Sequence, residues 1–305
     1  MASPRLLPAR SRAGRAALIA GTAAAVALAA SACAPKASTA ASSTTGASAA
    51  SSASCSASSL ALYKSGQLTV ATDSPAYSPW FDNNKPADGK GFESAVAYAV
   101  AKELGFSDSQ VKWVTESFDD SYAPGAKNFD FDINEISITA ARAKAVDFST
   151  GYYTANQGVL TLSTSKYAGA TALSQLKGAK IGVQISTTSY QAVQDEIKPS
   201  ASIAVYNTTD DEVQALKDHQ VDAIVTDMPT VFYLASAELD NGKIVGQFSY
   251  DGGGTPEQFG LLLQKGSKLT ACVDQAVAKL QSSGQLTAIT KQWLSDSADA
   301  PELGR

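Results

Sequence analysis

The chain has little histidine and cysteine, and each scarcity argues against a class of function. Its 305 residues contain one histidine and three cysteines. A single histidine, His219, argues against a His-based catalytic triad and against a metal site built from several histidines. No repeat with a period of roughly 20 to 50 residues is evident, which argues against a solenoid or a propeller. We therefore expect no metal and no cofactor.

Basic clusters are also lacking beyond the start of the chain. Four of the 24 lysines and arginines, Arg5, Arg10, Arg12 and Arg15, fall in the first 32 residues, which hold no acidic residue. Without that segment, 20 basic residues face 29 acidic ones. Nucleic acid attracts basic surfaces through its phosphates, so it is not an expected partner.

The apolar run of residues 16–30 is too short and too rich in alanine for a membrane span. It follows the basic start and precedes Ser31, Ala32 and Cys33, as in a signal peptide covering residues 1–32. The cysteine makes this segment resemble the lipobox of bacterial lipoproteins, in which that cysteine is lipidated. Ala30 stands where leucine is usual, so an ordinary secretory signal is the alternative. We expect a lipid on Cys33 and a location at the extracellular face of the cytoplasmic membrane.

Residues 33–59 are nearly all serine, alanine and threonine. Such a composition cannot form a packed core, so we interpret this segment as a flexible tether with a reach of roughly 25–30 Å. Cys55 lies in this tether and Cys272 in a helical pattern. We interpret Cys272 as a small core residue, with a Cys55–Cys272 disulfide as the alternative.

From residue 60 onward, strand and helix patterns alternate. We predict strands at residues 68–71, 111–114, 129–138, 158–162, 180–184, 203–206, 221–226, 243–248 and 259–264, and helices at 92–104, 187–197, 209–217, 229–238, 267–281 and 285–295. This alternation indicates mainly parallel sheets covered by helices on both faces. The length allows one large domain or two lobes. Residues 153–156 and 251–254 are candidate crossings between two sheets.

Ligands of open parallel sheets bind beyond the carboxyl ends of strands, and three such ends carry polar side chains. Ser137 and Arg142 follow one strand, and a guanidinium fits a carboxylate. Thr187 and Thr188 open a helix, where anions bind, although plain N-capping would also place them there. Asp227 ends a third strand and could receive an ammonium or cap a helix. Together the three ends supply groups for both charges of an amino acid.

Aromatic residues near the first two strands could enclose an organic side chain. Tyr77 and Trp80 lie in the first loop, and Phe118 follows the second strand. Such rings sandwich apolar groups or face cations, although core packing is the alternative for each of them.

The sequence resembles the polar amino-acid binding proteins of bacterial ABC importers. The resemblance covers residues 66–295 and rests on seven motifs in order: LTVATDSPAYSPWF, GFESAVAYAVAKELG, DFDINEISITAARAKAVDFSTGYY, LKGAKIGVQISTTSY, ALKDHQVDAIVTDMP, FGLLLQKGS and LQSSGQLTAITKQWL. It implies an α/β fold of the two-lobe, periplasmic-binding-protein-like (type II) class with two hinge crossings. Residues 60–154 and 250–305 would form lobe 1, and residues 155–249 lobe 2. The lobes would close on a free amino acid, and a monomer would deliver it to an ABC permease without catalysis.

The resemblance also implies roles for the candidate residues. Arg142, Ser137 and the helix start at Thr187 and Thr188 would hold the ligand α-carboxylate, and Asp227 would hold the α-ammonium. The side-chain part of the pocket would be lined by Asp73, Phe118 and either Tyr77 or Trp80, because the first loop is one residue longer than is usual.

The main departure from the family pattern is Glu135, since the family has small residues or amides at Asn134 and Glu135. A carboxylate facing the pocket would favour arginine, lysine, ornithine or histidine, whereas pairing with Arg142 or Lys144, or pointing to solvent, would have no such effect. With Asp132 also present, we favour a basic amino acid as the ligand. Three other functions stay open. They are an enzyme on this fold, such as a cyclohexadienyl dehydratase with Glu135 as its acid, a sensory module for a receptor, and a structural lipoprotein.

Overall fold

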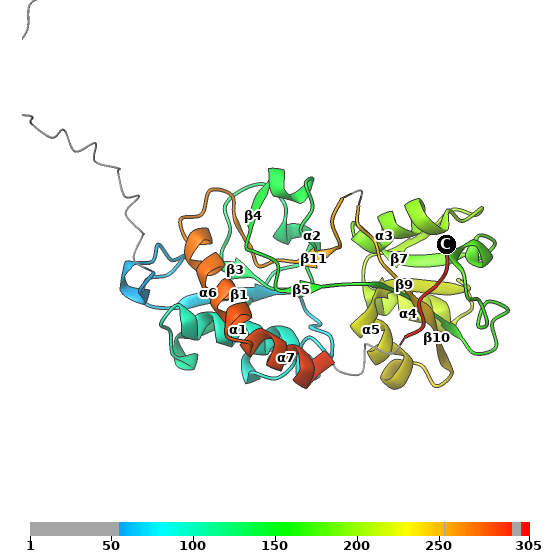
Figure 1. Cartoon of the computed structure of the whole chain (residues 1–305), viewed down its shortest axis with the longest axis horizontal. Coiled ribbons are helices and arrows are strands. Elements are labelled where there is room, and N and C mark those ends of the chain that lie inside the picture. Colours follow the sequence, from blue (N-terminus) through cyan, green and yellow to red (C-terminus); the bar gives the residue numbers. More distant parts are fainter. Residues whose placement is uncertain (1–54, 253, 295–299) are drawn as a thin grey trace, which may run out of the picture. The chain divides into compact units, whose positions relative to one another are not determined.

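The computed structural model describes residues 55–252, 254–294 and 300–305. The signal peptide predicted for residues 1–32, Cys33 with its expected lipid, and most of the expected tether lie outside these ranges. Figure 1 shows two groups of strands and helices, one from the early and late parts of the chain and one from its middle. Each group is a lobe of an α/β fold with its own five-stranded sheet. No helix in the described ranges is long and apolar enough to cross a membrane.

The first lobe is built on a sheet with the strand order β2-β1-β3-β12-β4. Its strands are β1 (Leu68–Thr72), β2 (Val111–Thr115), β3 (Phe131–Asp132), β4 (Val146–Phe148) and β12 (Leu262–Gln264). Its helices are α1 (Phe92–Glu103), α2 (Phe118–Ser121), α6 (Thr270–Ser282) and α7 (Gln285–Leu294). Short 3-10 turns cover Ala57–Ser59, Asp82–Asn84, Pro86–Asp88, Asp108–Gln110 and Arg142–Lys144.

The second lobe has the strand order β10-β6-β9-β7-β8. Its strands are β6 (Gln157–Leu162), β7 (Ile181–Gln184), β8 (Ala204–Tyr206), β9 (Ala223–Asp227) and β10 (Gly242–Phe248). Its helices are α3 (Thr188–Ala192), α4 (Thr209–Lys217) and α5 (Met228–Tyr233), with a 3-10 turn at Leu173–Leu176 and π-helical turns at Val193–Ile197 and Leu234–Glu238.

The prediction of mainly parallel sheets is wrong, because both sheets are mixed. In the first lobe, β1 pairs in parallel with β2 and β3, but β12 runs antiparallel to β3 and β4. In the second lobe, β6 runs antiparallel to both β9 and β10. The antiparallel strands β6 and β12 are the ones that enter a sheet soon after the chain has crossed between lobes. Consecutive parallel strands of one sheet are normally joined by a right-handed crossover, usually a helix, packed on that sheet. A strand that follows a crossing comes from the other lobe instead, so this rule does not fix its direction.

The two predicted crossings are present, one between β5 (Tyr153–Thr154) and β6 and the other between β10 and β11 (Gln258–Phe259). Strands β5 and β11 pair antiparallel as a separate two-stranded sheet. Expecting residues 250–305 to belong wholly to the first lobe was wrong at the C-terminus. Residues 300–305 lie against the second lobe, where Glu302 bridges Gln247 and Gly304 bridges Ala172. The chain therefore connects the lobes a third time, through residues outside the described ranges.

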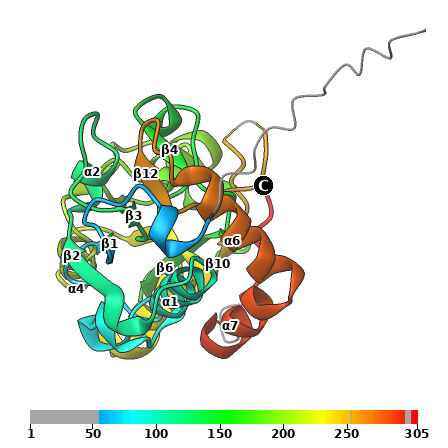
Figure 2. The ribbon, with the colours of Figure 1, turned by 90° about the vertical axis from the view of Figure 1, so that its left-hand side faces the viewer.

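The end of the expected tether is folded onto the first lobe. Cys55 forms a disulfide with Cys272 of α6, as the alternative predicted, and Cys272 is also a buried core residue of this lobe. Ala57 and Leu60 pack against the core of this lobe. Figures 1 and 2 both show the blue segment that contains these residues beside the orange helix α6. Residues 55–59, which were predicted to belong to the tether, are therefore part of the folded first lobe.

Candidate functional site

A cavity of about 60 Å³ lies between the two lobes and contains most of the predicted binding residues. These are Asp73, Tyr77, Phe118, Asn134, Glu135 and Ser137 from the first lobe and Thr187, Thr188 and Asp227 from the second. The wall is completed by Pro75, Gln184, Ser189, Thr209, Thr226 and Thr230. No lysine or arginine is among these lining residues, so the carboxyl groups face the cavity without a neighbouring cation in its wall.

Asp227 ends β9 and is one of the buried acids of this wall. It directly precedes α5, but its side chain makes no capping hydrogen bond to that helix. Its Oδ1 instead accepts a hydrogen bond from Nε2 of Gln157, at 2.9 Å. Burial, followed by the nearby charge of Glu257, raises the pKa of Asp227 well above its usual value. The alternative that the Asp227 side chain caps α5 is therefore wrong. Its carboxyl group lines the cavity, where it can contact a bound molecule.

Glu135 faces the second lobe and not a basic neighbour. Its Oε2 accepts a hydrogen bond from Oγ1 of Thr230 at 3.0 Å, so pairing with Arg142 or Lys144 does not occur. Its backbone has a φ of 52°, which lies in the left-handed region that favours glycine. Burial, with the charges of Glu93 and Asp227, raises the pKa of Glu135 well above its usual value.

Trp80 does not line the cavity. Its ring is fully buried and makes edge-to-face contacts with Phe92, Tyr153 and Phe259 at centroid distances of 5.8, 5.6 and 5.6 Å. Its Nε1 donates a hydrogen bond to Oγ1 of Thr230 at 2.7 Å. Of the two alternatives for Trp80, the structure therefore supports core packing. Tyr77 is the aromatic residue of the first loop that lines the cavity.

Arg142 does not line the cavity either. The residue is 8% exposed, and its Cζ lies over the rings of Phe118 and Tyr122, at 5.2 and 4.7 Å from their centroids. Nη1 donates to the carbonyl oxygen of Ser137 at 2.9 Å, and Nη2 to that of Ser186 at 3.0 Å. Arg142 thus borders a neighbouring groove of about 610 Å³ and joins the two lobes through backbone carbonyls.

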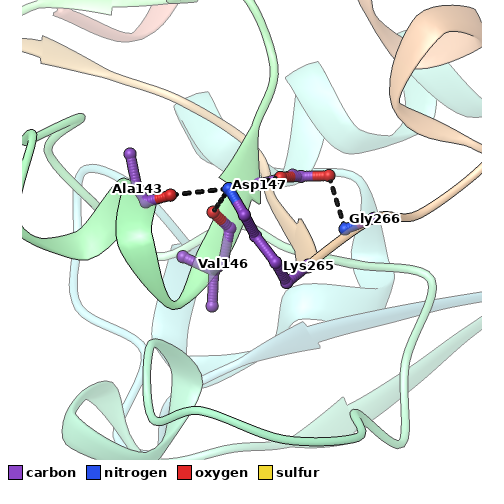
Figure 3. Close-up of polar contacts among 5 residues, drawn as sticks. All are labelled: Ala143, Val146, Asp147, Lys265 and Gly266. Carbon is purple, nitrogen blue, oxygen red and sulfur yellow. Dashed lines mark hydrogen bonds and ion pairs between the residues drawn. The ribbon is translucent and has the colours of Figure 1, made fainter.

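The turn that carries Arg142 is held in place by Lys265 at the end of β12. Figure 3 shows the Nζ of Lys265 reaching the carbonyl oxygens of Ala143 and Val146, at 2.7 and 3.4 Å, and the carboxylate of Asp147, at 3.0 Å. The same carboxylate accepts a hydrogen bond from the backbone of Gly266 at 2.8 Å. One ammonium therefore fixes the end of the Arg142 turn to the strand beside it.

Replacing Lys265 with methionine should lower the free energy of unfolding by about 1 kcal/mol, because the ion pair and the hydrogen bond to Ala143 are exposed and only the longer contact with Val146 is partly buried. Urea unfolding at neutral pH would measure it. Lys268→Met is the matched control, since Lys268 is exposed and lies three residues further along. Equal stability of the two variants would contradict a role for the Lys265 contacts.

Thr187 and Thr188, at the start of α3, have different contacts. Thr187 is the N-cap of α3, where its Oγ1 accepts from the backbone of Tyr190 and donates to the carbonyl oxygen of Gln184. Thr188 instead lies 3.2 Å from the hydroxyl of Ser137 in the other lobe. Plain N-capping therefore holds for Thr187, while Thr188 meets the first lobe.

Glu257 is the site residue that the sequence did not reveal. Its Oε1 accepts hydrogen bonds from the hydroxyls of Ser137, at 2.5 Å, and of Thr188. Its Oε2 accepts from Nε2 of Gln157, at 2.9 Å, and the same nitrogen donates to Asp227. A carboxylate of the protein thus holds the two hydroxyls that were expected to bind a ligand carboxylate.

The first-lobe wall of the cavity includes Asp73, Asn134 and Phe118. Oδ2 of Asp73 accepts from the backbone nitrogen of Phe118 at 3.2 Å, which fixes the start of α2 beside the first loop. Nδ2 of Asn134 is buried and has no protein partner among the described residues. This amide is therefore a donor left for a bound molecule.

Two further acids are buried behind this wall. Glu93 of α1 accepts hydrogen bonds at Oε1 from the hydroxyl of Tyr152 and from the backbone nitrogen of Glu135, at 2.7 Å for the latter. Asp132 of β3 is fully buried, and neither of its oxygens has a protein partner among the described residues. Burial raises the pKa of both groups, and that of Glu93 moves from 4.5 to about 7.

These shifts predict that the protein without ligand loses stability as the pH rises. A carboxyl whose pKa is raised by folding stabilises the folded state fully below its unfolded value and loses that contribution as the pH passes through the folded value. For Glu93 the window runs from 4.5 to about 7, and the loss is at most about 3 kcal/mol. The free energy of unfolding, measured with urea at pH 5 and at pH 8, should differ less between the two pH values in Glu93→Gln than in the wild type. The control Glu302→Gln, which changes an exposed carboxyl group, should show the wild-type difference between the two pH values. The same difference in Glu93→Gln would contradict the prediction.

The lobes are held together by polar contacts across the cavity. They run from Trp80 and Glu135 to Thr230, from Ser137 to Thr188 and from Arg142 to Ser186. Small-molecule pockets usually measure roughly 300–1,000 Å³, so the cavity of about 60 Å³ is too small for an amino acid in this arrangement. The lobes must separate before such a ligand can reach the site.

Comparison with known proteins agrees with this architecture. Residues 68–296 match the sequence model of the bacterial extracellular solute-binding proteins, family 3. The ABC transporter glutamine-binding protein GlnH of Bacillus subtilis is 28% identical over 221 residues, which are 71% of this chain and 77% of that protein. The L-cystine-binding protein TcyJ of Escherichia coli is 29% identical over 214 residues, or 68% of this chain and 75% of that protein.

Among solved structures, an ancestral arginine-binding protein bound to glutamine aligns with a TM-score of 0.63 and 29% identity, and the alignment covers 75% of this chain and 98% of that one. The family match spans both lobes and both hinge crossings described above. The chain therefore belongs to the bacterial extracellular solute-binding proteins of family 3.

Proposed function

We propose that this protein captures a basic amino acid between its two lobes, outside the cytoplasmic membrane, and delivers it to an ABC transporter permease. The observation that carries the proposal is the charge of the cavity. Asp73, Glu135 and Asp227 line it without a lysine or arginine in its wall. A ligand with two positive groups would pair with two of these three carboxyl groups, Glu135 and Asp227, whereas the single ammonium of a neutral or acidic amino acid would pair with only one.

The two ends of the ligand would be held by different lobes. Asp227 of the second lobe would receive the α-ammonium, and Glu135 of the first lobe would receive the side-chain cation. Arg142 has donors beyond the two that contact carbonyl oxygens, and it would reach the α-carboxylate once its bond to Ser186 opens. A ligand that touches both lobes stabilises the closed state by contacts that the open state lacks.

The remaining parts of the proposal follow from the sequence and from the family. A lipid on Cys33, outside the described residues, would keep the protein near the permease, and residues 34–54 would be a tether that gives the folded part reach above the membrane. The protein would act as a monomer, with residues 60–154 and 250–294 as lobe 1 and residues 155–249 with 300–305 as lobe 2. Residues 155–156 and 249–257 would be the hinges.

A thermal-shift screen of the mature chain tests the proposal. Arginine, lysine, ornithine and histidine would be compared with glutamine, glutamate and leucine. At about 100 times its Kd, a true ligand should add about 2.7 kcal/mol of stability. A shift with basic amino acids supports the proposal, and Glu135→Gln should reduce their advantage over glutamine. A shift with glutamine alone, or an unchanged preference in Glu135→Gln, would contradict the charge argument.

A further inference from the structure

The contacts of Glu257 decide which groups the cavity offers to a ligand. The residue lies in the return crossing, just before β11, and its side chain is 7% exposed. Ser137 and Thr188 come from different lobes, and both place their hydroxyls within hydrogen-bond distance of Oε1 of Glu257. The same hydroxyls line the cavity. They therefore stand between the carboxylate of Glu257 and any bound molecule.

Each hydroxyl has a single proton, and an ionised carboxylate only accepts hydrogen bonds. Either both hydroxyls donate to Glu257, or one donates to the other, 3.2 Å away, which then donates to Glu257. In both arrangements the two protons stay within the protein. Ser137 and Thr188 therefore present only lone pairs to the cavity, and lone pairs accept hydrogen bonds from an ammonium but give none to a carboxylate.

The side-chain donors of Thr187, Arg142 and Gln157 near this end also make hydrogen bonds within the protein. The hydroxyl of Thr187 donates to the carbonyl oxygen of Gln184, at 2.8 Å. The outer nitrogens of Arg142 contact two carbonyl oxygens, and its guanidinium lies outside the cavity wall. The amide of Gln157 bridges Asp227 and Glu257 with one nitrogen and so keeps the two carboxylates close together. This end of the site is consequently built to accept hydrogen bonds.

We propose that Glu257 is a specificity-determining residue that extends the substrate class of this site to basic amines without an α-carboxylate, such as guanidino- and amino-alkylamines. The inference rests on the proposed function, since it concerns the same cavity and the same cationic ligands. An α-carboxylate placed beside Ser137 and Thr188 would lie next to the carboxyl group of Glu257, and neither hydroxyl would have a proton to donate to it. A carboxylate-free amine meets neither obstacle, because its ammonium is a donor that Asp227 and the two hydroxyls accept.

Calorimetric titration of the mature chain with arginine and with agmatine, its decarboxylated counterpart, tests the inference. The two probes share the guanidinium and the alkyl chain and differ in the carboxylate. The wild type should bind agmatine at least as tightly as arginine. In Glu257→Ala, which frees both hydroxyl protons, arginine should gain at least tenfold relative to agmatine. Glu257→Gln keeps an oxygen for the hydroxyls and removes the charge, so it should shift the ratio in the same direction even if the alanine variant fails to fold.

The outcomes separate this inference from the proposed function. Tight binding of arginine with rejection of agmatine, and an unchanged ratio in both variants, would overturn the role of Glu257 and leave the basic amino-acid site intact. Binding of neither probe by the wild type would overturn both. Glu302→Ala removes an exposed carboxylate of the second lobe and should leave the arginine-to-agmatine ratio of the wild type unchanged.

Discussion

Replacing Asp227 with asparagine should weaken the binding of a basic amino acid about a thousandfold, which corresponds to about 4 kcal/mol. Asparagine keeps the shape of the side chain and still accepts the hydrogen bond from Gln157. It removes the negative charge, so the buried ligand ammonium loses its counter-ion. Loss of one partner from a buried, hydrogen-bonded charge pair costs roughly 2–5 kcal/mol.

Calorimetry with the most stabilising ligand of the screen would measure this loss. Asp240→Asn is the matched control, because Asp240 is an exposed aspartate of the same lobe and lies outside the cavity wall. It should bind like the wild type. A loss of less than tenfold in Asp227→Asn would show that another group receives the ammonium.

Removing the disulfide by replacing both Cys55 and Cys272 with serine should lower the free energy of unfolding by about 4 to 5 kcal/mol. The two residues are 217 positions apart, so the bond closes almost the whole folded chain into one loop. A cross-link across so long a loop restricts the unfolded chain strongly. Ligand affinity should not change, because neither cysteine lines the cavity.

Urea unfolding of the wild type with and without a reducing agent measures the same quantity independently. Reduced wild type and the Cys55→Ser, Cys272→Ser variant should unfold at the same urea concentration, and the variant should not respond to the reductant. A wild type that is equally stable when reduced would show that the bond contributes nothing.

Most helices and strands, and much of the cavity wall, could be predicted from the sequence. Both kinds of feature depend on patterns among residues that are close together in the chain. Alternation and helical spacing located β1, α1 and α4 to within a residue or two. A polar residue directly after an apolar strand located Asp227. The prediction of one strand over residues 129–138 was wrong beyond Asp132, because Glu135 adopts a positive φ that no strand accommodates.

The features that escaped prediction depend on contacts between distant segments. Glu257 follows a glycine-rich stretch that indicated only a crossing, and its partners lie 120 and 69 residues away. The roles of Trp80 and Arg142 depend on which neighbours cover them, and composition says nothing of that. The disulfide did have a signal: with Cys33 assigned to a lipid, an exported chain is left with two cysteines.

That disulfide also determines how a pull on the protein is distributed. Cys55 is the first described residue, and β1 begins only at Leu68. A force applied to the chain before Cys55 would pass through the sulfur–sulfur bond into α6 and bypass the segment that leads to β1. In reduced protein the same force would run along that segment and peel β1 from its neighbours β2 and β3. With the bond intact, such a force would therefore load α6 of the first lobe and leave the pairing of β1 with its neighbours unloaded.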